Sequence, residues 1–170
     1  MTTNRISPCL WFDNQAEEAA KFYTSIFRKS KINKTSHYTE AGRETHGQKP
    51  GSVMAVEFEL DGQTFTALNG GPVFKFNEAV SLMISCDTQD EIDYYWEKLT
   101  AGGDPNAQQC GWLKDKYGVS WQVVPRILAD LVATSDEEQA GRVMEALMPM
   151  KKLDIAELES AAAGHATSNR

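Results

Sequence analysis

The stretch CGWLKDKYGVSWQVVP, residues 110–125, decides the fold. A short apolar run over 111–114 is followed by a charged turn over 115–118 and by a second apolar run over 119–125. An aspartate at the first position of a tight turn bonds to the backbone ahead of it, so Asp115 is interpreted as a turn former, not a catalytic acid. The stretch therefore predicts a β-hairpin that closes a small sheet.

The segment upstream of this hairpin completes a module. Residues 79–86 are short and apolar, as in a strand, and Asp87 and Thr88 supply oxygens that can cap a helix over 89–101. A weaker strand is predicted near 105–109. Residues 79–125 therefore predict the order β-α-β-β-β.

The first part of the chain predicts the same order. Asp61-Gly62 is a two-residue hairpin signal between alternating strands, and Asp13 and Asn14 offer capping oxygens to the first helix. Residues 39–51 form a polar loop rich in glycine and proline. The predicted elements are a strand over 6–12, a helix over 16–27, a strand over 30–38, and strands over 53–60 and 63–69.

Two copies of this order in one short chain predict an α+β fold of two βαβββ modules, module one over 5–70 and module two over 79–125. Helical patterns follow over 127–133, 136–148 and 153–163. The predicted organisation is a paired domain over 5–133, a C-terminal helical extension over 134–163 and a disordered tail over 164–170.

Composition limits the classes of partner. The 170 residues carry a formal net charge of −7 and no basic stripe, which argues against nucleic-acid binding. No stretch approaches the ~20 apolar residues of a membrane span. Three cysteines without a CxxC pair, and no secretory signal, predict a reduced, cytoplasmic protein that does not bind membranes.

Four segments resemble the PhnB-like branch of the vicinal oxygen chelate superfamily, often labelled demethylubiquinone methyltransferase-like. They are PCLWFDNQAEEAAKFY, FELDGQTFTALNGGPVFKFNEAVS, CDTQDEIDYYWEKL and CGWLKDKYGVSWQVVP. The resemblance covers about residues 5–160. It implies the paired βαβββ fold, a homodimer and a small-molecule ligand.

Metal-dependent members of the superfamily hold a divalent ion with His, Gln or Glu on the first and last strands of each module. The family's glutamate, four residues after the turn glycine, corresponds here to Gln122, and its histidine corresponds to Ser81 or to a neighbour such as Val80. In module one neither His nor Gln stands near Ser7–Cys9, and the last strand offers Ala67 or Asn69. The expected metal site is degenerate, with Gln122 and support from Asn69 or Cys9.

Other residues are weaker candidates for a cleft between the sheets. Lys75, between the modules, could meet an anionic group, and either Trp112 or Trp121 could line the cleft. The histidines His37, His46 and His165 are interpreted as surface residues. The candidate site residues are Gln122, Asn69, Cys9, Trp112, Trp121 and Lys75.

Three functions remain open from the sequence. The first is a small-molecule-binding protein with a lost or degenerate metal site, without a confidently expected cofactor. The second is a metal-dependent lyase, isomerase or dioxygenase that uses Gln122 and a divalent ion. The third is the methyltransferase of the family label, which the sequence supports least: Asn69-Gly70-Gly71-Pro72 is glycine-rich, but no helix pattern follows it.

Overall fold

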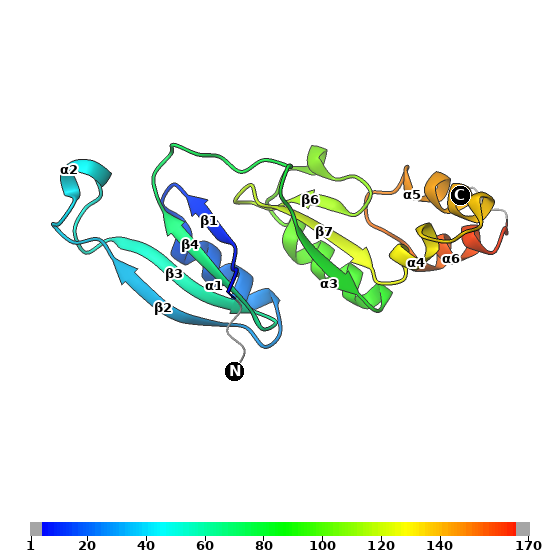
Figure 1. The fold of residues 1–170 in the computed structure, drawn as a ribbon, viewed down its shortest axis with the longest axis horizontal. Coiled ribbons are helices and arrows are strands. Elements are labelled where there is room, and N and C mark those ends of the chain that lie inside the picture. The colour runs from blue at the N-terminus through cyan, green and yellow to red at the C-terminus, as the bar shows by residue number, and fades with distance from the viewer. Residues whose placement is uncertain (1–4, 166–170) are drawn as a thin grey trace. The chain divides into compact units, whose positions relative to one another are not determined.

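A computed structural model describes residues 5–165 of the chain (Figure 1). The chain divides into two compact units, residues 1–76 and 77–170. The first unit contains module one, and the second contains module two together with the C-terminal helices. Each is an α+β unit built on a small mixed sheet, which confirms the predicted fold class.

Module one is a four-stranded sheet with one long helix on its face. Its strand order is β1-β4-β3-β2, with β1 parallel to β4 and the other pairs antiparallel. A single turn of helix, α2, lies within the predicted polar loop. The elements are β1 (Cys9–Phe12), α1 (Ala16–Ile26), β2 (Lys31–His37), α2 (Arg43–His46), β3 (Val53–Leu60) and β4 (Gln63–Asn69).

Alternation along the strands sets the core of module one. Val56, Phe58 and Leu60 of β3 are buried, and the residues between them are more exposed, because successive side chains point to opposite faces of a sheet. The buried face meets the apolar stripe of α1. That stripe consists of Ala16, Ala19, Ala20, Tyr23 and Ile26, as the helical periodicity predicted.

The N-terminus of α1 is capped from a distant strand. The structure shows no side-chain cap from the segment before the helix, so the prediction that Asp13 or Asn14 caps it is wrong. Instead, Asn69 Oδ1 of β4 accepts from the Ala16 N–H at 2.8 Å. Because β4 ends beside the start of α1, the buried amide of Asn69 satisfies one of the free donors at the helix end.

Module two is a shorter version of the same arrangement. Its strand order is β5-β7-β6, with β5 parallel to β7 and β6 antiparallel to it. Helix α3 is capped by its own Thr88, as predicted, whose side chain accepts from Glu91 N–H. The elements are β5 (Leu82–Cys86), α3 (Gln89–Thr100), the 3₁₀ helix η1 (Pro105–Ala107), β6 (Trp112–Lys114) and β7 (Ser120–Pro125).

The predicted strand near 105–109 is not formed, so module two lacks the counterpart of β2. Pro105 has no N–H for a ladder, and the Asp104 side chain accepts from Asn106 N–H at 2.9 Å, which favours the 3₁₀ turn. Only Gln109 forms an isolated bridge, to Trp112. The observed order in module two is therefore β-α-3₁₀-β-β.

Three helices follow module two and pack in the same unit (Figure 1). They are α4 (Leu128–Val132), α5 (Glu137–Leu147) and α6 (Ile155–Ala162), close to the predicted positions. They share a buried cluster of Val143, Leu147, Met150, Leu153 and Leu158. No helix among residues 5–165 is both long and apolar enough to cross a membrane.

The first two residues of the predicted disordered tail belong to the folded structure. Gly164 N–H donates to Ala161 O and His165 N–H to Ser160 O, both at 3.1 Å. These two residues therefore close the end of α6 in the manner of a helix C-cap. The rest of the predicted tail, residues 166–170, lies outside the described residues.

Candidate functional site

Each sheet has one face covered by its own helix and one face turned away from that helix, which we call the outer face. In module two, Trp121, Val123 and Pro125 of β7 are buried on the helix side with Ile92 and Leu99 of α3. The alternate residues of β7, Ser120, Gln122 and Val124, therefore point to the outer face. This alternation decides which candidate residues can act together.

The outer face of module two carries Gln122 at its centre. Gln122 pairs with Met83 of β5 on one side and with Trp112 of β6 on the other. Paired residues of neighbouring strands point to the same face. Met83 is 61% exposed, and Trp112 is half-buried. The row Met83–Gln122–Trp112 thus combines a thioether, an amide and an indole.

Gln122 is bonded to Ser81, one of the two residues that the family resemblance suggested for the histidine position. Its Nε2 donates to Ser81 Oγ at 2.8 Å. The Ser81 oxygen accepts this bond, so the hydroxyl proton of Ser81 can still be donated to another group. The carbonyl oxygen of the Gln122 side chain can still accept a hydrogen bond. The pair therefore presents one neutral donor and one neutral acceptor.

Asp115 and Trp121 serve the hairpin. The buried Asp115 carboxylate accepts from Tyr117 N–H at 2.8 Å and Val119 N–H at 3.0 Å through Oδ1, and from Trp121 Nε1–H at 2.8 Å through Oδ2. The prediction that Asp115 forms the turn is confirmed. The indole of Trp121 lies on the helix side of the sheet, so of the two tryptophans only Trp112 reaches the outer face.

The counterpart of Gln122 in module one is Thr66. Thr66 pairs with Cys9 of β1 and with Glu57 of β3, as Gln122 pairs with Met83 and Trp112. The signal was in the sequence: Thr66 stands four residues after the turn glycine Gly62, the spacing from Gly118 to Gln122. The residues considered there, Ala67 and Asn69, are both buried, and Ala67 lies on the face covered by α1.

Two more candidates lie away from both outer-face rows. Asn69 uses its oxygen on Ala16 and donates from Nδ2 to Val53 O at 3.0 Å, so its amide joins β4, α1 and β3. Lys75 is exposed in the segment that follows β4. A role for Lys75 in meeting an anionic group stays a prediction.

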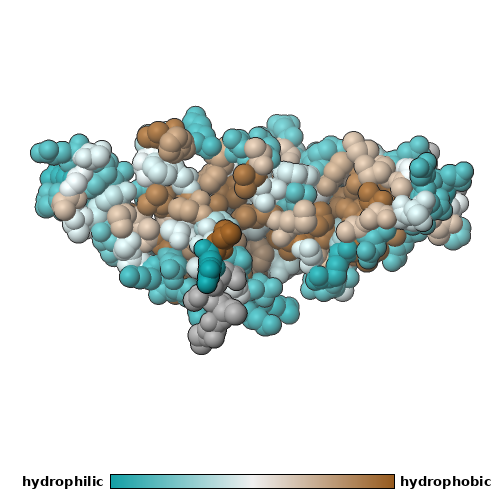
Figure 2. All heavy atoms as spheres, in the orientation of Figure 1, coloured by the Kyte–Doolittle hydropathy of each residue, from teal (hydrophilic) through white to brown (hydrophobic). Residues whose placement is uncertain are grey.

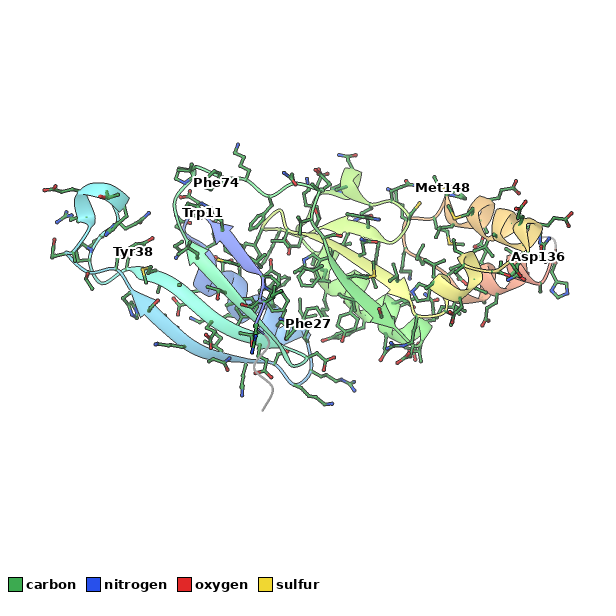
Figure 3. All side chains as sticks on the ribbon, in the orientation of Figure 1. Trp11, Phe27, Tyr38, Phe74, Asp136 and Met148 are labelled. Carbon is green, nitrogen blue, oxygen red and sulfur yellow. The ribbon has the colours of Figure 1, made fainter. Side chains whose placement is uncertain are left out.

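The glycine-rich turn after β4 receives a tryptophan. A Cβ on Gly70 would lie 2.1 Å from Trp11 Cζ2, so only glycine leaves room for the ring. Trp11 Nε1–H donates to Gly71 O at 2.8 Å, and Phe74 packs edge-on against the indole at 5.0 Å (Figure 3). No helix follows the turn. Packing of Trp11 therefore accounts for Gly70, and a φ of +87° accounts for Gly71.

The segment that follows this glycine-rich turn also carries apolar surface. Val73 is 71% exposed and Phe74 62% exposed, and Figure 2 shows hydrophobic atoms on this segment.

The titratable groups do not converge. Residues 5–165 contain no group of three or more His, Cys, Asp or Glu side chains placed to hold a metal ion. The cysteines are all free thiols. Burial raises the pKa of Cys9, and burial followed by the charges of Glu91 and Asp87 raises the pKa of Cys86 to about 12. Cys86 is therefore protonated at neutral pH.

Comparison with known proteins agrees with this architecture. Residues 4–124 match the family described as 3-demethylubiquinone-9 3-methyltransferase. The chain belongs to this family. It is the PhnB-like branch of the vicinal oxygen chelate superfamily, which the sequence motifs indicated. The family match ends within β7, so α4, α5 and α6 lie outside it.

Several solved structures are similar to the chain. The PhnB protein from Bacillus cereus is 38% identical with a TM-score of 0.61, over 72% of this chain and 99% of that one. A protein from Staphylococcus aureus is 30% identical over 72% of this chain and 97% of its own, with a TM-score of 0.32. A Pseudomonas aeruginosa protein is 16% identical with a TM-score of 0.54, over 72% and 98%, and shows the fold alone. No curated protein matches the chain.

Proposed function

We propose that this member of the PhnB-like family binds an uncharged, partly aromatic small molecule on the outer face of module two. The observation that carries the proposal is the Gln122–Ser81 hydrogen bond, 2.8 Å long, at the centre of a row that ends in Trp112. An indole supplies a flat apolar surface, and the amide–hydroxyl pair supplies one donor and one acceptor. Small-molecule sites commonly combine these features.

The donor set on this face does not fit a divalent ion. Divalent ions are held in proteins by carboxylates, carbonyl oxygens and, for transition metals, imidazoles. Here the two family ligand positions hold Gln122 and Ser81, which are neutral and bonded to each other. An ion at the free carbonyl oxygen of Gln122 would meet only neutral ligands from these two positions. We therefore derive no step through a metal.

A neutral aromatic probe tests the proposal. We expect 1-naphthol to bind and to shift the NMR signal of the Trp112 indole, and Gln122→Ala to weaken binding about tenfold because one hydrogen bond is lost. Thr66→Ala, the same change at the matching position of module one, is the control and leaves binding unchanged. We expect an anionic probe, 2-naphthalenesulfonate, to bind more weakly than 1-naphthol, because the proposed ligand is uncharged.

The result also decides among the alternatives. Tighter binding of the sulfonate, lost in Lys75→Ala, would favour an anionic ligand near Lys75. Stoichiometric binding of Mn²⁺ that requires Gln122 would contradict the neutral site and favour the metal-dependent enzyme.

A second candidate function is the methyl transfer in the family description, because the match spans residues 4–124. A demethylubiquinone ring with hydroxyl and carbonyl oxygens also belongs to the ligand class proposed above. Calorimetric titration with S-adenosylmethionine tests the candidate. Binding of the methyl donor would favour transfer, whereas binding of 1-naphthol without it favours a binding protein.

We also propose that the protein is a homodimer, which the family resemblance implies. Light scattering coupled to gel filtration measures the mass directly, and a mass near 18.9 kDa, that of one chain, would contradict the dimer.

A further inference from the structure

The turn that leads into β6 is strained. Gln109 and Trp112 exchange two backbone hydrogen bonds, Gln109 N–H to Trp112 O at 3.1 Å and Trp112 N–H to Gln109 O at 2.8 Å. The two residues between them, Cys110 and Gly111, have φ of +50° and +82°. Positive φ at both central positions defines a type I′ turn, which favours asparagine and glycine. A cysteine there carries a Cβ that this conformation disfavours.

The C-terminal extension holds this turn by its backbone. Cys110 N–H donates to Met150 O and Gly111 N–H to Lys151 O, both at 2.8 Å. Gly111 also packs tightly, because a Cβ there would lie 2.9 Å from Val123 O and 3.1 Å from Leu153 Cδ1. The strained turn therefore has both of its central donors satisfied by the segment that follows α5.

The same segment is anchored on α3. The Gln89 side chain donates from Nε2 to Leu153 O at 3.1 Å and accepts at Oε1 from Ile155 N–H at 2.9 Å. Lys152 Nζ lies 2.6 Å from Asp93 Oδ1. Leu153 itself is fully buried in the cluster that joins α5 and α6. Figure 3 labels Met148, where this anchored segment begins.

We propose that the segment 148–155 is a positioning element for the outer face of module two. It holds the strained turn 109–112, and the turn places Trp112 opposite Gln122. That Trp112 faces a ligand rests on the proposed function, whereas the positioning itself does not. The segment lies outside residues 4–124, the part of the chain that matches the family.

Hydrogen exchange on the full-length protein tests the positioning. Gln89→Ala removes both side-chain bonds to the segment, and we expect the amides of Cys110 and Gly111 to exchange about tenfold faster or more. We also expect the Trp112 indole N–H signal to move in NMR spectra. The control is Gln15→Ala, at the N-terminus of α1 in module one, which leaves the turn and the indole unchanged.

A second variant separates positioning from general loosening. Cys110→Gly relieves the strain, so in the Gln89→Ala background the Trp112 signal returns towards its wild-type position while the amides of residues 110 and 111 still exchange quickly. If the segment had only a structural role, Cys110→Gly would restore both the indole signal and slow amide exchange, or neither of them. Unchanged exchange in Gln89→Ala, or no return of the indole signal, overturns the proposal.

Titration with 1-naphthol distinguishes this proposal from the proposed function. Weaker binding in Gln89→Ala that Cys110→Gly restores supports both. If the wild-type protein fails to bind the probe while the indole responds as expected, the positioning stands and the proposed ligand class fails. If Gln122→Ala weakens binding but Gln89→Ala moves neither the indole nor the affinity, the ligand class stands and the positioning fails.

Discussion

The two modules form the same kind of sheet and capped helix with different residues. Module one has four strands, and a distant asparagine caps its helix; module two has three strands, a local threonine cap and an extension that holds its strained turn. Their outer-face rows differ in chemistry as well. Module one presents Cys9, Thr66 and Glu57 in the positions where module two presents Met83, Gln122 and Trp112. A shared topology therefore leaves the chemistry of each face free to diverge.

The hairpin turns give the largest expected contrast. We expect Asp115→Ala to destabilise module two by about 3 kcal/mol, because three donors lose their acceptor and the indole N–H of Trp121 is buried. The aspartate of the module-one turn, Asp61, is exposed, so Asp61→Ala costs less than about 1 kcal/mol. Native-state hydrogen exchange measures the stability of each module separately. Equal losses in both would show that Asp115 adds nothing beyond turn propensity.

The helix caps give a smaller contrast. We expect Asn69→Ala to destabilise module one by about 2 kcal/mol, because it removes a cap and a bond to β3 from a buried site. Thr88→Ala removes a single exposed cap in module two and costs about 1 kcal/mol. The same hydrogen-exchange measurement compares the loss of stability in the two variants. A larger loss in Thr88→Ala contradicts the cross-strand role of Asn69.

We expect low pH to destabilise module two by weakening its ion pairs. Hydrogen bonding to Lys152, then to Gln89, lowers the pKa of Asp93, and Arg126 does the same for Asp87. A carboxylate whose pKa is lowered on folding stabilises the fold above its ordinary pKa and loses that contribution as the pH falls. Because these pairs are exposed, the effect is small and weakens in salt. The protection factor of the Gly111 amide, which corrects its exchange rate for the intrinsic effect of pH, should fall below about pH 4. Asp93→Asn should remove most of that dependence.

The thiols should differ in reactivity without a change in stability. With a pKa of about 12, Cys86 holds a thiolate fraction of ~10⁻⁴ at pH 8, and it is buried as well. We expect a thiol reagent to modify Cys9, which is exposed in module one, and to leave Cys86 intact in the native protein. Mass spectrometry of the labelled peptides identifies the modified cysteines. Rapid labelling of Cys86 would contradict its burial.

Local patterns predicted the elements, and long-range contacts decided the rest. The apolar stripe of α1, the Asp61-Gly62 hairpin and the turn at Asp115 follow from neighbours in the sequence. The cap from Asn69 joins residues 53 positions apart, which no local pattern records. The cysteine in a type I′ turn is also explained only by carbonyl groups some 40 residues later in the chain, at Met150 and Lys151.

The candidate site was predictable in part for the same reason. The spacing from the turn glycine located Gln122 and, applied to module one, locates Thr66. Alternation along the strand already places Trp121 on the face opposite to Gln122, whereas the face of Trp112 depends on the register of β6 against β7. The spacing could not show that Ser81 bonds to Gln122, since β5 and β7 meet only in the folded sheet.

The cap that Asn69 provides also bears on the order of folding. Helix α3 carries Thr88 beside its first turn, so a nascent α3 is capped as soon as that turn forms. Helix α1 gains its cap only when β4 has paired with β1 and brought Asn69 to Ala16. Closing that long loop costs chain entropy before the contact is gained. We therefore expect the first helix of the chain to be stabilised late, and we expect φ-value analysis to find higher φ-values in the β3–β4 hairpin than at the N-terminus of α1.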